Sequence, residues 1–219
     1  MHVIASLAVS LDGRIAAHVG TATLGSTRDL DRLHRLRAGA DAVLAGGNTM
    51  RAWPMAWVDD SARADVPRVD RDRPLLNVVL TRGGIPLDAP RFWHDPRTMP
   101  LVLSTSALHV PRGECVTRPS WTPLAVIEEL RSRDVHTVLL EGGGGVLGPF
   151  LQADLVDSLH VTLCPLVLGG GPSLVSGVAP WTREGAPRLR LTSVLPVGDE
   201  VFLTYVRADG YDPIPGDPR

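Results

Sequence analysis

The sequence of 219 residues contains no lysine, so all 22 of its basic side chains are arginine. A chain without lysine cannot form a lysine Schiff base with a substrate, and it has no lysine to act as a general base. Any phosphate group that this protein binds must therefore be held by arginine, by backbone N–H groups or by hydroxyl groups.

Cysteine is almost as scarce. The chain has only two cysteines, Cys115 and Cys164, and they stand far apart. Neither a Cys-x-x-Cys pair nor a His-Glu-x-x-His segment is present, although these are the spacings typical of zinc sites. We therefore expect two thiols without a special role and predict no metal site.

Long apolar runs and blocks of one charge are also missing. There is no run of 18 apolar residues and no charged-then-apolar leader after Met1, and the net charge is −2 with both signs scattered along the chain. A nucleic-acid or membrane partner would favour a basic block. The sequence predicts a soluble, cytoplasmic protein that binds small molecules or a second copy of itself.

Short apolar segments alternate with segments of helical periodicity along most of the chain. This alternation predicts an α/β fold with a mixed, mainly parallel twisted sheet and helices on both faces. The last two apolar segments are expected to form an antiparallel C-terminal edge. The expected strands are residues 3–9, 42–45, 75–80, 101–103, 138–140, 155–163, 188–195 and 200–207. Helices are expected after Ser26 or Thr27, from Pro123, and near residues 146–152.

The segment that starts at Glu141 carries the strongest local signal. Four glycines, Gly142 to Gly145, follow this acidic residue between an expected strand and an expected helix. Glycine lets a ligand approach the backbone closely, and a helix start offers unpaired N–H groups and a positive dipole end. Together these features predict a pyrophosphate site. A second glycine-rich strand end, residues 46–49, could enclose the same cofactor from another side.

Two further residues at strand ends leave alternatives open. Arg82 follows an expected strand, where a guanidinium could pair with an adenosine 2′-phosphate, or could be solvated. Asp12 sits in the turn after the first strand, where a carboxylate either acts as a general acid or accepts hydrogen bonds from turn amides.

Taken together and in order, these segments resemble the pyrimidine reductases of riboflavin biosynthesis. The resemblance spans about residues 3 to 206 and rests on residues 9–16, 34–49, 141–144, 155–157 and 165–170. It implies a dihydrofolate-reductase-like fold, a single reductase domain over residues 1–207 with a frayed tail over residues 208–219, and a homodimer. The implied reaction uses NADPH to reduce the ribosylamino group of a pyrimidine phosphate to a ribitylamino group.

The resemblance also implies roles for individual residues. Arg37 and Glu141 face the substrate, and Glu141 is the expected proton donor. The other substrate contacts are expected at Thr21 and Ser26. NADPH is expected to contact Val9, Thr49, Thr81, Arg82, Gly142, Gly143, Gly144, Gly145, Val146 and Leu147. A cis peptide bond is expected between Gly142 and Gly143.

One segment departs from the family pattern. After Gly-x-Thr the pathway enzymes usually carry Asp-Asp-Pro or Asp-Asn-Pro, but this chain has Met50-Arg51-Ala52-Trp53-Pro54-Met55-Ala56-Trp57. Trp53 and Trp57 make this part of the expected pocket larger, flatter and more apolar. Two other functions therefore stay open: a dihydrofolate reductase, with Asp29 or Asp31 as its acid, and a nucleotide-binding module without catalysis.

Overall fold

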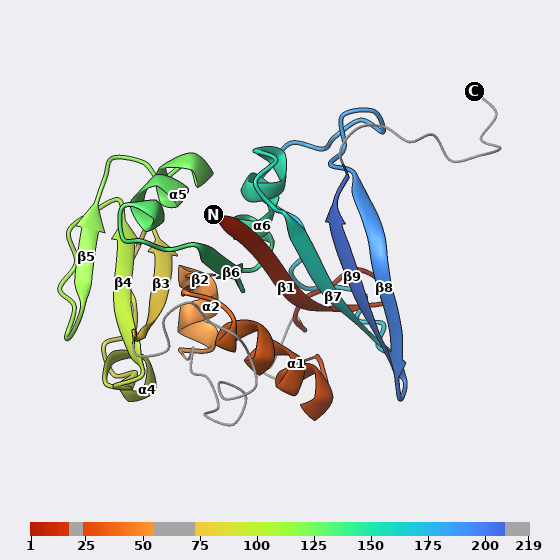
Figure 1. Cartoon of the computed structure of the whole chain (residues 1–219), viewed down its shortest axis with the longest axis horizontal. Coiled ribbons are helices and arrows are strands. Elements are labelled where there is room, and N and C mark those ends of the chain that lie inside the picture. The colour runs from red at the N-terminus through yellow and green to blue at the C-terminus, as the bar shows by residue number, and fades with distance from the viewer. Residues whose placement is uncertain (18–23, 55–72, 209–219) are drawn as a thin grey trace.

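The computed structural model describes residues 1–17, 24–54 and 73–208. These residues form a nine-stranded sheet with the order β5-β4-β3-β2-β6-β1-β7-β9-β8 (Figure 1). The strands are β1 His2–Ser10, β2 Ala42–Gly46, β3 Leu75–Thr81, β4 Thr98–Ser104, β5 Glu114–Thr117, β6 Thr137–Leu140, β7 Ser158–Cys164, β8 Leu189–Val197 and β9 Glu200–Arg207.

The sheet is parallel from β5 to β7 and antiparallel at β9 and β8, as the sequence predicted. The reason lies in the connections. Longer segments, several of them helical, separate the parallel strands and let the chain return to the same edge of the sheet. Only Gly198 and Asp199 separate β8 from β9, and Gly198 has a positive φ of 64° that suits a tight hairpin turn.

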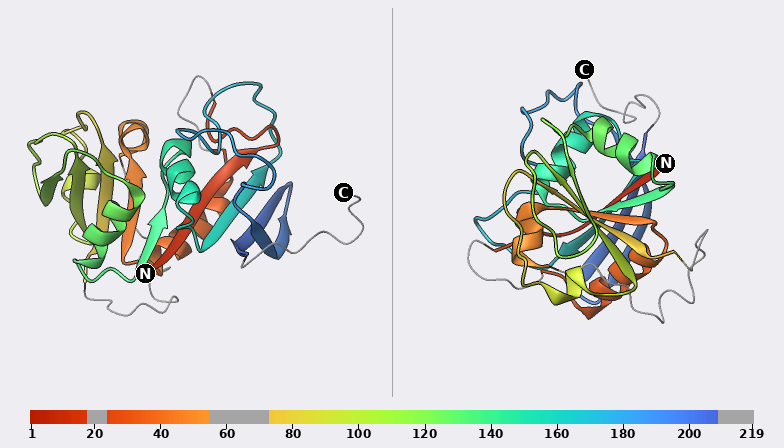
Figure 2. Two further views of the ribbon diagram at one scale, coloured as in Figure 1. Left: turned by 90° about the horizontal axis from the view of Figure 1, so that it is seen from above. Right: turned by 90° about the vertical axis from the view of Figure 1, so that its left-hand side faces the viewer.

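Helices cover both faces of the sheet, which confirms the second part of the prediction. They are α1 Thr27–Ala38, α2 Gly47–Ala52, α4 Pro90–Trp93, α5 Pro123–Arg131 and α6 Gly144–Gln152. Figure 2 shows the sheet edge-on, with α5 and α6 on one side and the helices α1 and α4 on the other.

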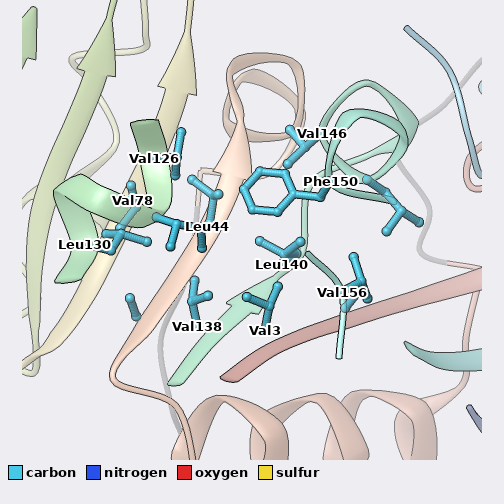
Figure 3. Close-up of a cluster of buried hydrophobic side chains, with 14 of the residues drawn as sticks. Val3, Leu44, Val78, Val126, Leu130, Val138, Leu140, Val146, Phe150 and Val156 are labelled. Carbon is cyan, nitrogen blue, oxygen red and sulfur yellow. The ribbon is translucent and has the colours of Figure 1, made fainter. Parts of the chain in front are cut away.

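The main core lies between the sheet and the helices α5 and α6. Leu44 and Leu140 from the strands pack there against Val126, Val146 and Phe150 from the helices (Figure 3). Because side chains alternate across a strand, the preceding residue of β6 packs on the opposite face: Leu139 belongs to a smaller cluster with Leu33 and Leu36 of α1. The same alternation turns the next side chain, that of Glu141, toward α1.

Several elements differ from the prediction. The helices α2 and α4 and the short strand β5 were not expected, because they are too short to show a period. Helix α6 begins at Gly144, two residues earlier than expected. The sequence did not predict a helix at Gly144 and Gly145 because glycine has a low helix propensity. Of the expected frayed tail, residues 208–219, only Ala208 is described, and its backbone N–H donates to the carbonyl oxygen of Arg188 at 3.1 Å; residues 209–219 lie outside the described part of the chain.

Candidate active site

The carboxyl ends of β3, β2, β6 and β1 lie side by side, and the predicted cofactor residues follow three of them. Ligands in sheets of this kind bind beyond these strand ends, where several loops meet. The order of the strands therefore brings together segments that are about 35 to 95 residues apart in the sequence.

The glycine segment forms the entry to α6. Gly143 is the N-cap residue, with φ −62° and ψ −176°, and no side chain caps the helix. The first N–H groups of a helix have no acceptor within it, so this end offers donors to an anion. The expected cis bond between Gly142 and Gly143 is wrong: the peptide bonds of the described residues are all trans, the form without the energetic penalty.

The glycines of this segment differ in their surroundings. A Cβ atom on Gly142 would lie 2.6 Å from Cβ of Val146, and one on Gly144 would collide with the carbonyl oxygen of Ser173. Packing within the protein thus explains both glycines. A Cβ atom on Gly143 would meet only the end of the Ile15 side chain, at 3.2 Å, and its φ is accessible to any residue. Gly143 is therefore confined by the flexible end of one side chain rather than by backbone, which is compatible with the approach of a ligand in front of the helix.

The end of β2 connects this segment with the end of β3. A Cβ atom on Gly46 would lie 3.1 Å from Cγ2 of Val146, and one on Gly47 would lie 2.5 Å from Oγ1 of Thr81. The side chains of Val146 and Thr81 thus pack closely on the glycine backbone at the end of β2 and connect α6 with β3. Arg82 follows Thr81 at the end of β3, and its side chain is exposed.

Val9 is placed differently from the other predicted cofactor residues. Its side chain is 5% exposed and belongs to the core on the side of α5 and α6. A contact of Val9 with a cofactor would therefore have to involve its backbone.

Arg37 and Glu141, the two expected substrate residues, form an ion pair. Nε of Arg37 donates to Oε1 of Glu141 at 2.6 Å, and Nη2 donates to Oε2 at 2.5 Å. The two side chains are 4% and 11% exposed. Burial lowers the pKa of Arg37, but the carboxylate of Glu141 outweighs that effect and raises the pKa above its usual value. In this geometry the carboxylate accepts two charge-assisted hydrogen bonds.

A small recess of about 30 Å³ lies beside this pair, under α2. Its lining combines polar groups of Thr49, Asn77 and Glu141 with apolar side chains of Val43, Ala45, Met50, Trp53, Val79 and Phe92. A volume of this size holds about one water molecule or a small polar substituent. Trp53 is 43% exposed at the rim, where it adds the apolar surface that the sequence predicted; Trp57 lies outside the described residues.

Ser26 is the N-cap residue of α1, but its hydroxyl does not cap the helix. Its backbone N–H and its Oγ both donate to the carboxylate of Glu200, at 2.7 and 2.6 Å. Sequence reasoning missed Glu200, because nothing local marks an acidic residue at the start of β9 as the partner of a residue 174 positions away. Thr21, the other expected substrate residue in this loop, lies outside the described residues.

The open question about Asp12 is settled by its contacts. Its carboxylate accepts hydrogen bonds from the backbone of Leu168 at 3.0 Å, from Gly169 at 2.8 Å, and from Oγ of Ser10 at 2.7 Å. The hydrogen bond from Leu168, followed by that from Ser10, lowers the pKa of Asp12 to about 2. Asp12 therefore stabilises a loop contact and does not supply a proton at neutral pH.

Within residues 1–17, 24–54 and 73–208, no three metal-binding side chains come together in a way that could hold an ion. No helix in the same part of the chain is long and apolar enough to cross a membrane.

Comparison with known proteins places this geometry in a family. Residues 1–203 match the family described as the RibD C-terminal domain. The chain belongs to this family.

Relatives of known name agree with this assignment. The chain is 30% identical over 220 residues to the 2,5-diamino-6-ribosylamino-4(3H)-pyrimidinone 5′-phosphate reductase of Methanothermobacter thermautotrophicus, covering 93% of this chain and 97% of that protein. It is 32% identical to the riboflavin biosynthesis protein RibD of Mycobacterium tuberculosis, over 94% of this chain and 54% of that protein. The chain thus spans nearly all of the first relative and about half of the second.

Solved structures share the fold. A pyrimidine reductase-like protein of Corynebacterium diphtheriae superimposes with a TM-score of 0.79 at 20% identity, over 95% of this chain and 92% of that one. The deaminase and reductase of Thermotoga maritima superimposes with a TM-score of 0.74 at 22% identity, over 94% of this chain and 56% of that one. The predicted dihydrofolate-reductase-like fold is confirmed.

Proposed function

We propose that this RibD-family protein is an NADPH-dependent reductase of riboflavin biosynthesis. Its substrate in this proposal is a pyrimidine ribosyl phosphate, whose ribosylamino group is reduced to ribitylamino. The family match and the archaeal reductase that aligns over 97% of its length support this reaction.

The arrangement at the end of β6 is the observation that carries the proposal. Leu140 ends the strand, Glu141 turns toward α1 and pairs with Arg37, and Gly143 opens the entry to α6. The short segment from Leu140 to Gly143 thus links a charged pair on the substrate side with a cofactor site on the other. Such an arrangement suits a reaction in which a hydride passes between two bound molecules.

The residues at the strand ends fit a nicotinamide dinucleotide phosphate. The space in front of Gly143 and the N-terminal end of α6 suit the pyrophosphate, and Thr49, Thr81 and Arg82 extend the site toward β3. The cofactor, when bound, supplies the hydride. The preference for NADPH over NADH is assigned in this proposal to Arg82, because a 2′-phosphate adds negative charge that a guanidinium binds well.

In the proposed reaction the sugar ring opens before it is reduced, and a proton must reach the opened sugar. The bidentate pair makes Glu141 an acceptor that can orient a substrate hydroxyl or a water molecule. We therefore propose that Glu141 relays the proton from such a group, and that Arg37 holds the carboxylate in position. Removing this relay is expected to lower turnover by roughly 10²–10⁴-fold.

The decisive experiment follows NADPH oxidation at 340 nm with the purified protein. The substrates are 2,5-diamino-6-ribosylamino-4(3H)-pyrimidinone 5′-phosphate, the corresponding ribosylaminouracil phosphate, and dihydrofolate. Oxidation with either pyrimidine supports the proposal. Oxidation with dihydrofolate alone would identify a dihydrofolate reductase, and NADPH binding without any oxidation would leave a nucleotide-binding module.

Dihydrofolate belongs in this assay because of Asp29. This residue lies on α1, where burial and its hydrogen bond with Thr162 act on the carboxyl in opposite directions and the net effect raises its pKa. A dihydrofolate reductase would need an acidic residue on this first helix to bind its pterin substrate. Two further parts of the proposal are a homodimer and a cytoplasmic location, which sedimentation analysis and cell fractionation test directly.

A further inference from the structure

Arg51, in α2, is held in a fixed position without being neutralised. Its Nη1 donates to the carbonyl oxygen of Gly84 at 2.8 Å, and its Nη2 donates to Oδ1 of Asn48 at 2.5 Å. Both acceptors are uncharged, and Arg51 forms no ion pair in the described part of the chain. A guanidinium bound in this way keeps its full charge and has N–H groups left for a ligand.

The position of Arg51 is at the end of β3. The point that a Cβ atom of Gly47 would occupy lies 2.5 Å from Oγ1 of Thr81 and 3.3 Å from Nη1 of Arg51. The guanidinium of Arg51 and the hydroxyl of Thr81 therefore both lie close to Gly47. Oγ1 of Thr81 also accepts a hydrogen bond from the backbone of Gly83 at 3.2 Å, which shapes the turn after the strand.

Arg82 lies in this turn and contributes a second charge. Its side chain is exposed, and within the residues described it has neither an ion pair nor a hydrogen bond. Gly83 and Gly84 border open space, since a Cβ atom on either would meet nothing within 4 Å. Two cations thus adjoin an accessible surface, whereas the buried hydroxyl of Thr81 donates to the carbonyl oxygen of Gly83 at 2.9 Å and holds the turn in place. A phosphate monoester, with a charge of roughly −1.5 to −2 at pH 7, matches the two cations.

We propose that Arg51 is a specificity-determining residue, which together with Arg82 binds the adenosine 2′-phosphate of NADPH. The inference rests on the cofactor in the proposed function, but not on the identity of the pyrimidine substrate. Arg51 supplies the prearranged part of this phosphate subsite, because α2 and the turn already hold its guanidinium. Arg82 supplies a mobile charge that closes on the phosphate from the solvent side.

The test measures binding rather than turnover. Isothermal titration with NADPH, NADH, adenosine 2′,5′-bisphosphate and adenosine 5′-monophosphate separates the effect of the 2′-phosphate from all other contacts. We expect Arg51→Ala to weaken NADPH and the bisphosphate by about tenfold, which corresponds to about 1.4 kcal/mol, and to change NADH and the monophosphate less than about twofold. Arg51→Lys should keep part of the preference for NADPH over NADH, because lysine retains the positive charge but not the paired N–H donors of the planar guanidinium.

Arg35→Ala is the matched control, since Arg35 is an exposed arginine of α1 that forms no ion pair with any residue the structure describes. It removes the same charge and should leave all four affinities unchanged. If Arg51→Ala weakens NADPH and NADH equally, Arg51 only supports the loop, and the inference is refuted. An Arg51→Ala protein with an unchanged NADPH preference refutes it as well. A parent protein that binds both cofactors equally would instead overturn the proposed cofactor.

Discussion

Alanine substitutions in the glycine segment separate the requirements of the fold from those of the cofactor. At Gly143 the new methyl group meets only the flexible end of Ile15, at 3.2 Å, and the backbone φ of −62° is normal for alanine. Replacing glycine by alanine at a compatible φ even stabilises a protein by about 0.4–1 kcal/mol, through the unfolded state. Gly143→Ala should therefore fold normally, while its methyl group occupies the space in front of α6.

The expected loss of cofactor affinity is at least tenfold, or about 1.4 kcal/mol, because the pyrophosphate must approach this part of the backbone. The assays are titration with NADPH and thermal unfolding of the same samples. Gly170→Ala is the control: a Cβ atom there would meet nothing within 4 Å, and Gly170 is not among the expected cofactor contacts, so both measurements should match the parent protein.

Alanine at Gly142 or Gly144 should instead lower the stability of the protein. Gly142→Ala forces a methyl group against Val146, and Gly144→Ala forces one against the backbone of Ser173. Overpacking of this kind costs about 1–3 kcal/mol, so both variants should unfold at lower temperature. A Gly143→Ala protein that binds NADPH like the parent would refute the assignment of this loop to the cofactor.

Three further predictions follow from individual contacts. Arg82→Ala should remove most of the preference for NADPH over NADH, and equal dissociation constants in the parent protein would contradict that role. Glu141→Gln leaves the guanidinium of Arg37 buried without a counter-charge, so it should lower the free energy of unfolding by roughly 3–5 kcal/mol in addition to lowering turnover. Replacing both residues by leucine should restore stability but not activity. Recovered activity in this double variant would exclude a proton relay through Glu141. Asp12→Asn should lower the melting temperature at pH 7. The lowered pKa of Asp12, about 2 against a usual 3.8, means that its contribution is present above about pH 4 and is lost as the pH falls toward 2. The difference in melting temperature from the parent protein should therefore shrink over that range, and a constant difference would contradict this role.

Much of the fold could be read from local patterns. Apolar segments of strand length, separated by helical segments, predicted the parallel sheet, and two adjacent strand segments predicted the antiparallel edge at β8 and β9. Burial on both faces makes such strands continuously apolar, which is visible in a single sequence. Short elements such as α2 were missed, because six residues do not establish a period.

The candidate site was predicted in part. Glycines after a strand predicted a cofactor site, since backbone access is a local requirement, and this role stays a prediction. Their separate roles were not predictable: whether a glycine faces the backbone of Ser173, as Gly144 does, or only the end of the Ile15 side chain, as Gly143 does, depends on how distant loops pack against α6.

By itself, the sequence determined the alternation of strands and helices, the place of the glycine segment and the dependence on arginine for any side-chain cation. The tertiary structure alone decided the partners of the charged side chains. Arg37 meets Glu141 across 104 residues, and Ser26 meets Glu200 across 174 residues. The physical reason is that side-chain periodicity acts within an element, whereas these contacts depend on the order of the strands in the sheet. That order brings β6 next to β2 and β9 next to β7, so that their residues reach α1.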